Sequence, residues 1–354
     1  MSAAVRAAIM GASGYGAAEL LRLLTQHDDV EVVSATSTSR VGDSIGEVHS
    51  HLRGFYDLTV SESIDFERLF DADHSVIFSS LPHGESAARI DRLLKSLERD
   101  AWRERVKIID LSGDLRIKDA ELHARNYPKT PLLAELRERF VYGMPELDRE
   151  AIRTARFVAN PGCLATASIL AAAPLISTKT RGTIVVDAKT GSSGSGRTLK
   201  DTTHHPTRHG DFRAYKPLAH QHEPEIVQAW GDARCERIEL SFVAQSMDVA
   251  RGIFATVHVT LPEDADCDAL LRQYRDYYSD SPFVRVVDGS PTLQDVVGSN
   301  FCDVGVACRG RMVIAMAALD NLVKGMAGMA IQNMNLMCGL PETTGLWTPS
   351  FRPV

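Results

Sequence analysis

The sequence predicts two domains of different class: an α/β domain with a Rossmann-type parallel sheet, then an α+β domain with a mostly antiparallel sheet. The first third alternates short apolar runs with helical periods, which is typical of βαβ units. The middle carries longer, β-branched and partly alternating runs, which are typical of antiparallel strands. A chain of 354 residues also fits two domains, at about 150 residues for each.

Each expected element has its own local signal. In the first third, right-handed crossovers between the apolar runs favour an open, doubly wound sheet. The middle also contains a segment, 191–218, that is rich in Gly, Ser, Thr, His and Pro, and we expect it to be a long functional loop. The expected strands are 5–10, 30–34, 76–79, 106–110, 182–188, 238–245 and 253–261, and the expected helices are 17–24, 85–97, 267–278 and 321–337.

Composition excludes several classes of protein. With 44% hydrophobic and 24% charged residues the chain resembles an ordinary globular protein, not a disordered or fibrous one. Its net charge of −7, with both signs interspersed, argues against nucleic acid as a partner. We expect neither a signal peptide nor a membrane span. Six scattered cysteines without CxxC pairs or a short disulfide framework suit a reducing cytoplasm, with most thiols structural.

A glycine-rich turn follows the first expected strand and opens the first expected helix. Glycines let the backbone approach a pyrophosphate closely, and the helix N-terminus favours its negative charge. After the second strand, hydroxyl groups and an arginine stand where an NAD site usually has an acidic residue, which favours the 2′-phosphate of NADP. The residues expected to bind the cofactor in these two segments are Gly11, Ser13, Gly14, Tyr15, Gly16, Ser37, Thr38, Ser39 and Arg40.

Cys163 follows Asn160, Pro161 and Gly162, which end a strand, and falls in the first turn of the next helix. The amide groups and dipole of a helix N-terminus lower the pKa of a thiol and so favour the thiolate. The sequence therefore indicates Cys163 as a nucleophile.

Histidines gather within the long loop and just after it. A zinc site is not expected, because no cysteine or carboxylate pair lies nearby with ligand spacing. Acid–base work beside Cys163 suits this cluster better, with Glu225 orienting His222. The clustered residues are His204, His205, His209, His220 and His222.

Cationic side chains in or next to the same region suit a substrate with phosphoryl or carboxylate groups. They are Arg197, Arg208, Arg213, Lys216 and Arg251. Farther on, Asp320 is a candidate N-cap of the last helix, and the Asn321 side chain there is placed either to hold a nicotinamide amide or to cap the helix.

Taken together, these segments resemble the N-acetyl-γ-glutamyl-phosphate reductase family of arginine biosynthesis, whose members use NADPH. The matching stretches run in order along the whole chain. They are GASGYGAAELLRLL at 11–24, DLSGDLR at 110–116, YGMPEL at 142–147, NPGCLATA at 160–167, KTGSSGSGR at 189–197, HQHEPEI at 220–226, VGSN at 297–300 and DNLVKGMAGMAIQNMNLMCGL at 320–340.

The resemblance implies a fold like that of aspartate-semialdehyde dehydrogenases, with a dinucleotide-binding domain at 1–160 completed by a C-terminal helix within 321–354. Residues 161–320 would then form the catalytic and oligomerisation domain. It implies that Cys163 is the nucleophile, His222 its acid–base partner and Glu225 a support for His222. It also implies that Ser13–Gly16, Ser37–Ser39 and Asn321 contact NADP. We expect Asn160, Ser193, Arg197, His205 and Arg251 to bind the substrate.

Two substrates remain open. The chain lacks the His and Pro that precede the Arg251-Gly252 pair in the arginine-pathway enzymes. Its His204-His205-Pro206 and Tyr215-Lys216-Pro217 runs resemble a sister group. That group reduces γ-aminoadipyl or glutamyl phosphate linked to a small acidic carrier protein. Relatives are dimers or tetramers, so we also expect a homo-oligomer.

Two alternatives from other classes are weaker. A non-catalytic dinucleotide-binding regulator predicts a disrupted nucleophile, yet Cys163 and His222 are both present. A thiol redox sensor needs a resolving cysteine close in sequence to Cys163, and none is visible there.

Overall fold

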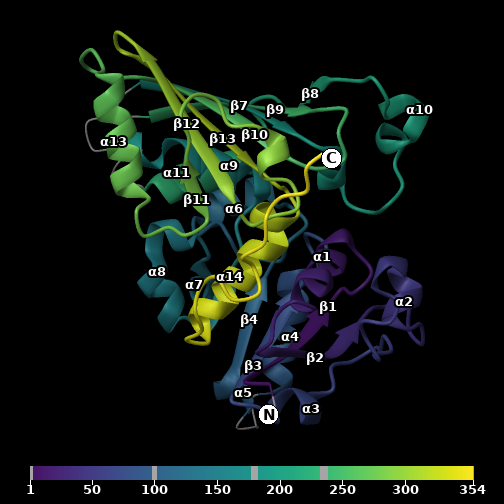
Figure 1. Cartoon of the computed structure of the whole chain (residues 1–354). Coiled ribbons are helices and arrows are strands. Elements are labelled where there is room, and N and C mark those ends of the chain that lie inside the picture. The colour runs from purple at the N-terminus through teal and green to yellow at the C-terminus, as the bar shows by residue number, and fades with distance from the viewer. Residues whose placement is uncertain (1–2, 98–101, 177–181, 232–237, 354) are drawn as a thin grey trace. The chain divides into compact units, whose positions relative to one another are not determined.

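The computed structural model describes residues 3–97, 102–176, 182–231 and 238–353. The chain forms two compact units (Figure 1). Unit 1 comprises Met1–Pro161 and Met326–Trp347, and unit 2 comprises Gly162–Gly325 and Thr348–Val354.

Unit 1 is built on a parallel sheet with the strand order β2-β1-β3-β4-β6-β5. The end of each central strand is tied to its neighbour: the Ser80 amide donates to Met10 O at 2.8 Å and the Leu111 amide to Ser79 O at 2.9 Å. The loops that follow β1, β3 and β4 therefore lie side by side at the carboxyl edge of the sheet. The strands are β1 (Val5–Met10), β2 (Val30–Thr36), β3 (His74–Ser79), β4 (Val106–Asp110), β5 (Val141–Tyr142) and β6 (Phe157–Ala159).

Helices cover this sheet because its strands are apolar on both faces. On one face, Ile77 and Ile108 belong to the same buried cluster as Ile90 and Leu94 of α4. Among the other helices, α14 contacts β4, α8 and α1. The helices of unit 1 are α1 (Tyr15–Leu24), α2 (Ile45–Val48), η1 (Ser50–Leu52), α3 (Phe66–Phe70), α4 (Ser86–Ser96), α5 (Trp102–Arg105), α6 (Ala120–Asn126), α7 (Ala134–Glu138), α8 (Pro145–Thr154) and α14 (Gly328–Met337).

Unit 2 is built on a sheet with the order β11-β12-β13-β10-β7-β9-β8. The pairs β7–β9 and β11–β12 are parallel and the other four pairs are antiparallel, so the sheet is mostly antiparallel, as the sequence predicts. Its strands are β7 (Gly182–Thr190), β8 (Arg213–Tyr215), β9 (Ile238–Ser246), β10 (Ile253–Thr260), β11 (Val284–Val286), β12 (Cys302–Arg309) and β13 (Met312–Leu319).

One helix, α9 (Cys163–Ala172), packs against β7, β10, β12 and β13 of this sheet. Its sequence is apolar or small on every side, as expected of a buried helix. α11 contacts α9 and β9, and α13 contacts β11 and β12. The other helical elements of unit 2 are η2 (Ala173–Leu175), η3 (Ser192–Ser195), η4 (Asp201–Thr203), α10 (His205–Arg208), α11 (Glu223–Trp230), α13 (Cys267–Tyr277) and η5 (Leu293–Asp295). The π-helix η6 (Val323–Ala327) begins in unit 2, and its last two residues belong to unit 1.

The structure differs from expectation at two chain segments. The segment 191–218 is not one irregular loop, because it contains η3, η4, α10 and β8. The chain returns to unit 1 at Met326, and its last residues lie in unit 2, where the Phe351 amide donates to Val297 O at 2.9 Å. The expected C-terminal extension of the first domain, 321–354, thus corresponds to Met326–Trp347 here.

The cysteines also differ from the expectation of free, structural thiols. Cys267 and Cys308 form a disulfide, with their Cα atoms 5.6 Å apart. The reason is tertiary packing, since α13 begins at Cys267 and lies against β12, near whose end Cys308 stands. Cys163, Cys302 and Cys338 are reduced thiols, and Cys235 lies outside the described residues.

Candidate functional site

Cys163 is the first residue of α9, and its neighbour Gly162 is the N-cap. The Gly162 amide donates to a carboxylate oxygen of Glu225 at 2.6 Å. Glu225 lies in the first turn of α11 and is fully buried. This bond brings the N-termini of two helices together, one carrying Cys163 and the other capped by His222.

His222 and His220 form a buried pair at the start of α11. Their ring centroids lie 4.8 Å apart, and the His222 amide donates to Nδ1 of His220 at 3.2 Å. Burial, with a smaller contribution from the charge of Lys216, lowers the pKa of His220 to about 4. His220 is therefore neutral at physiological pH and accepts a hydrogen bond from the backbone.

Tyr215 of β8 joins this cluster, although the sequence analysis did not select it as a site residue. Its ring lies 5.6 Å from that of His220. Burial raises the pKa of Tyr215, and the negative charge of Cys163 raises it further. Tyr215 is therefore within electrostatic reach of Cys163. The run Tyr215-Lys216-Pro217 was its only signal in the sequence.

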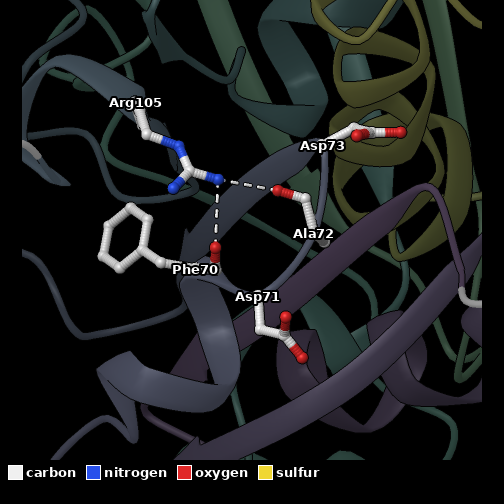
Figure 2. A pocket seen from close by; sticks show the side chains of 5 residues that line it. All are labelled: Phe70, Asp71, Ala72, Asp73 and Arg105. Carbon is white, nitrogen blue, oxygen red and sulfur yellow. Dashed lines mark hydrogen bonds between the residues drawn. The ribbon is translucent and has the colours of Figure 1, made fainter.

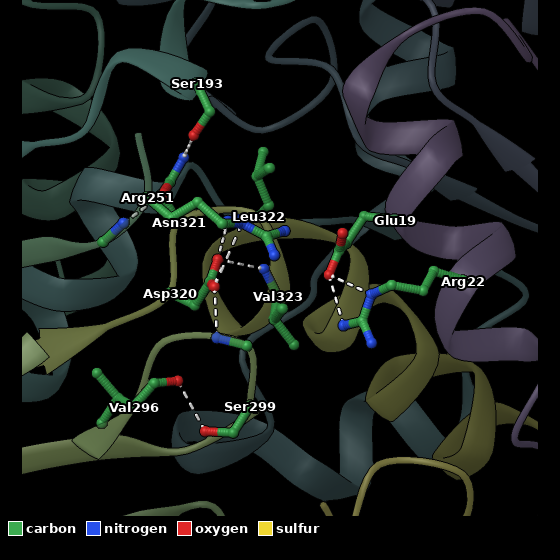
Figure 3. Close-up of polar contacts among 12 residues, drawn as sticks. Glu19, Arg22, Ser193, Arg251, Val296, Ser299, Asp320, Asn321, Leu322 and Val323 are labelled. Atoms are coloured by element: carbon green, nitrogen blue, oxygen red, sulfur yellow. Dashed lines mark hydrogen bonds and ion pairs between the residues drawn. The ribbon is translucent and has the colours of Figure 1, made fainter. Parts of the chain in front are cut away.

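A buried carboxylate, Asp320, organises the turn that precedes η6 (Figure 3). Asp320 accepts the amides of Gly298 at 2.7 Å, Leu322 at 2.8 Å and Val323 at 3.2 Å. Its Oδ2 also lies 3.5 Å from Nε of Arg251. Asp320 thus acts as the N-terminal cap expected from the sequence, and it also fixes the guanidinium of Arg251.

Asn321 holds two other segments in place. Its Oδ1 accepts the Gly252 amide at 2.8 Å, and its Nδ2 donates to Ser193 Oγ at 2.9 Å (Figure 3). The structure therefore brings Asn321, Ser193 and the Arg251-Gly252 pair together within unit 2.

Gly325, in η6, lies directly against Cys163. A Cβ atom added to Gly325 would lie 2.7 Å from Cys163 Cβ, closer than real Cβ atoms approach one another. Only glycine at this position leaves Cys163 where it is. The sequence analysis missed Gly325, since only the fold shows the contact.

Other predicted residues are placed differently. Asn160 is fully buried in unit 1, where its Nδ2 donates to Met326 O at 3.0 Å and its Oδ1 accepts Asn333 Nδ2 at 3.1 Å. Arg197 lies in an exposed bend and His205 in exposed α10, with its ring centroid 5.5 Å from that of His209. The five clustered histidines of the sequence thus divide into a buried pair and an exposed group.

The glycine-rich turn in unit 1 has the geometry of an anion cradle. Gly11 has a φ of +84°, which favours glycine. Gly14 is the N-cap of α1 without a side-chain cap, and a Cβ there would meet nothing within 4 Å. The first turn of α1 carries no acidic residue. The open approach and the helix N-terminus together fit a dinucleotide pyrophosphate.

The hydroxyl-rich segment directly follows β2. The Ser39 amide donates to Ser37 Oγ at 3.3 Å, so the backbone turns here. Arg40 forms an ion pair with Asp43 and donates to Glu47 O at 3.4 Å. The Arg40 side chain is still about one-third exposed when it contacts Asp43 and Glu47, so it remains accessible to a phosphate.

A hollow of about 380 Å³ in unit 1 is lined by residues outside the predicted site (Figure 2). Arg105 lines it and donates to Phe70 O at 3.0 Å and to Ala72 O at 2.8 Å. The hollow lies just before β3, at the amino end of the strand, whereas parallel sheets bind ligands at the carboxyl ends.

In the part of the chain that the structure describes, no group of three or more His, Cys, Asp or Glu is arranged to hold a metal, and no helix is long and apolar enough to cross a bilayer.

Comparison with known proteins links both units to one enzyme group. Residues 6–155 match the NAD binding domain of semialdehyde dehydrogenases, and residues 163–321 match their dimerisation domain. Solved structures agree on the fold. Aspartate semialdehyde dehydrogenase II from Vibrio cholerae has a TM-score of 0.67 at 18% identity, with 94% of this chain and 98% of that chain covered. The aspartate semialdehyde dehydrogenase from Candida albicans, solved with NADP, has a TM-score of 0.63 at 13% identity, with 94% and 98% covered.

Curated relatives are similar over their whole length. An N-acetyl-gamma-glutamyl-phosphate reductase from Symbiobacterium thermophilum is 43% identical, with 97% of each chain covered. One from Pelotomaculum thermopropionicum is 40% identical, covering 99% of this chain and 100% of the relative. A protein from Cenarchaeum symbiosum, named a LysW-linked L-2-aminoadipate/L-glutamate phosphate reductase, is 41% identical with the same coverage.

Proposed function

The chain belongs to the N-acetyl-γ-glutamyl-phosphate reductase family, and from that premise we propose that it reduces N-acetyl-γ-glutamyl phosphate with NADPH. The products are N-acetylglutamate semialdehyde and phosphate, and the pathway is arginine biosynthesis. The observation that carries this assignment is the bond between Glu225 and the Gly162 amide, because it joins the helix start of Cys163 to that of His222.

Cys163 is the proposed nucleophile. Its thiolate, favoured by the amides and dipole of α9, attacks the acyl carbon, and phosphate leaves with the electron pair of the acyl–oxygen bond. Cys163 then holds the acyl group as a thioester. After reduction, the sulfur takes back its bonding pair and the aldehyde departs.

His222 is the proposed acid–base residue. It protonates the oxygen that becomes negative during reduction and takes that proton back as the sulfur departs. Glu225 fixes the start of α9 by accepting the Gly162 amide, and it does so from the helix that His222 caps. The neutral His220 beside His222 adds no competing positive charge.

Unit 1 is the proposed cofactor domain. The cradle of Gly11, Gly14 and Gly16 would hold the pyrophosphate of NADP, with Ser13 and Tyr15 beside it. Residues Ser37–Arg40 would hold the 2′-phosphate. When bound, NADPH supplies the hydride that reduces the acyl group to the aldehyde.

Unit 2 is the proposed substrate domain. Arg251, which Asp320 fixes, is the donor we assign to the substrate carboxylate or phosphate. Ser193 is held in place by the side chain of Asn321. To bind the cofactor, Asn321 would have to give up its hydrogen bond to Ser193 or to the Gly252 amide. Arg197 and His205 are candidates on the exposed part of the segment 191–218. We leave Asn160 out, because both polar atoms of its side chain are engaged inside unit 1.

A second substrate is favoured by the exposed cations of the segment 191–218. Its cations would suit a small acidic carrier that presents γ-aminoadipyl or glutamyl phosphate, as the name of the Cenarchaeum symbiosum relative suggests. The chemistry at Cys163 would be the same, and only the group on the substrate amine would differ. The exposed cations are Arg197, Lys200 and Lys216, with His204, His205 and His209 among them.

We also propose a cytoplasmic homo-oligomer, because the named relatives are biosynthetic enzymes and residues 163–321 match a dimerisation domain. The sheet of unit 2 packs one face against α9. The alternate residues of the same strands place Val185, Val243, Phe254 and Met316 on the other face, where each is half-buried or exposed. A second copy would cover these apolar side chains.

The test runs the reaction in reverse. Purified protein with NADP, phosphate and N-acetylglutamate semialdehyde should produce NADPH, followed by its absorbance. Cys163→Ser should lower the rate by at least about 1,000-fold, since covalent catalysis is lost. Cys338→Ser is the matched control, because burial raises the pKa of the Cys338 thiol to about 12 and keeps that thiol inert.

The outcomes distinguish the two substrates and test the covalent mechanism. Activity only with the aldehyde linked to the acidic carrier would select the second substrate. A Cys163→Ser enzyme as active as wild type would contradict the covalent mechanism.

A further inference from the structure

The run Asp-Leu-Ser-Gly-Asp-Leu-Arg at 110–116 follows β4 and has no part in the reaction described above. Two of its carboxylates, Asp110 and Asp114, are fully buried in unit 1. Buried carboxylates are costly unless they are hydrogen-bonded. Their partners therefore show what these residues do.

Asp114 caps α4 from a distant part of the chain. One carboxylate oxygen accepts the Gly84 amide at 2.8 Å and the Thr130 hydroxyl at 3.0 Å. The other accepts the Ala87 amide at 3.1 Å. The N-cap of α4 itself, Glu85, makes no side-chain cap bond. Asp114 thus supplies the negative charge and the acceptors that a helix N-terminus favours.

Asp110 ties together the ends of two strands. One of its oxygens accepts the Ser86 hydroxyl at 2.6 Å and the Ser112 amide at 3.0 Å, and the other accepts the Ser112 hydroxyl at 2.8 Å. The Ser86 hydroxyl lies 2.7 Å from that of Ser79, the last residue of β3. Asp110 and Asp114 therefore fix the carboxyl end of the loop 80–85 directly, and Asp110 reaches its amino end through the Ser86 and Ser79 hydroxyls.

That loop is in direct contact with the glycine-rich turn. A Cβ on Gly11 would lie 2.8 Å from Ser80 O, and a Cβ on Gly16 would lie 2.7 Å from Ser80 Oγ. The Ser80 amide also donates to Met10 O at 2.8 Å. Ser80 therefore packs closely against the turn from Gly11 to Gly16, and a shift of Ser80 toward that turn would displace it.

We propose that Asp110 and Asp114 are positioning residues for dinucleotide binding. By fixing the loop 80–85, they hold the turn at 11–16 in the conformation that receives the pyrophosphate. This inference rests on the proposed use of NADP. It differs from a purely structural role, because it requires that cofactor affinity fall even where the protein remains folded.

The test is the affinity of Asp114→Asn for NADP, measured by titration calorimetry at constant pH and salt. Asparagine presents an NH2 group to one of the two amides, so the loop loses a charge-assisted bond. We expect the Kd for NADP to rise about tenfold, in line with one bond to a charged group. The kcat at saturating NADP and the alkylation rate of Cys163 in unit 2 should stay within about twofold.

Asp91→Asn is the matched control, because Asp91 lies on the same helix and pairs with Lys95, four residues farther along it, at 2.8 Å. Its NADP affinity should equal that of wild type. Should Asp114→Asn not fold, Ser86→Ala removes the hydroxyl between Asp110 and Ser79 and should raise Kd by about threefold.

The outcomes are distinguishable. If wild type binds NADP and a folded Asp114→Asn or Ser86→Ala protein binds it equally well, the inference is wrong and the carboxylates serve stability alone. If wild type itself does not bind NADP, the proposed function fails and the inference fails with it.

Discussion

Asp110 is a carboxyl group whose ionisation opposes folding. Burial, opposed in part by its bonds to Ser86 and Ser112, raises the pKa of Asp110 from 3.8 to about 6. The folded protein therefore holds this proton more tightly than the unfolded chain between about pH 4 and pH 6. The contribution of Asp110 to stability falls as pH rises through that window.

Asp110→Asn should remove this pH dependence. A change in pKa from 3.8 to about 6 corresponds to about 3 kcal/mol. The free energy of unfolding of the variant minus that of wild type should therefore rise by about 3 kcal/mol between pH 4 and pH 7. Urea denaturation across this range measures it. A difference that stays constant with pH would mean that Asp110 titrates alike in both states.

At the scale of elements, the strands of unit 1 were the most predictable. The expected strand 5–10 is β1 and the expected strand 106–110 is β4, because buried parallel strands appear as short apolar runs between turns. The helix expected at 321–337 is instead η6 followed by α14. The reason is tertiary, since Asp320 caps the turn and Gly325 lies against Cys163.

The site was predictable only where its signal is local. Cys163 could be predicted from the strand end and helix start around it, and the structure places it at the first position of α9. The bond from Glu225 to Gly162 spans 63 residues, and that from Asp114 to Ala87 spans 27. Nothing in a single sequence indicates such pairs, because only the folded chain brings them together.

The contact between η6 and the start of α9 makes a sharp prediction. In Gly325→Ala the new methyl group would lie 2.7 Å from Cys163 Cβ, so one of the two elements must move. A displacement of a nucleophile by about 1 Å costs on the order of 100-fold in rate. We expect kcat to fall by roughly that factor while the Kd for NADP stays unchanged.

Steady-state kinetics and NADP titration of this variant give both numbers. The alkylation rate of Cys163 by iodoacetamide is a third measurement, and it should change as well, because the thiol leaves its place at the helix start. Wild-type kcat in Gly325→Ala would show that η6 does not position Cys163.

At the scale of the whole molecule, the chain divides its proposed tasks between the two units. The glycine-rich turn belongs to unit 1, whereas Cys163, His222 and Arg251 belong to unit 2. The sequence carries no signal for the return of the last residues to unit 2. There the Phe351 ring occupies the space that a side chain at Gly298 would fill, a contact that has no pattern in the sequence.

The proposed homo-oligomer depends on the free face of the unit 2 sheet. Val185 stands on that face in β7 and is 38% exposed in the single chain, so an arginine there has room in a monomer. In a dimer closed by this face the same arginine would bury a charge away from water, which is strongly unfavourable. Val185→Arg should therefore weaken self-association at least tenfold without lowering the melting temperature of the monomer.

Val249→Arg is the matched control, since Val249 is 40% exposed in unit 2 but lies outside the strands. Light scattering coupled to size-exclusion chromatography over a range of concentrations measures the mass of both variants. We expect Val185→Arg to elute as a monomer where wild type and Val249→Arg remain oligomeric. Because Cys163 and His222 come from one chain, the monomer should keep its reactive thiol, and iodoacetamide labelling checks this. A Val185→Arg protein with wild-type mass would place the contact between copies on another surface.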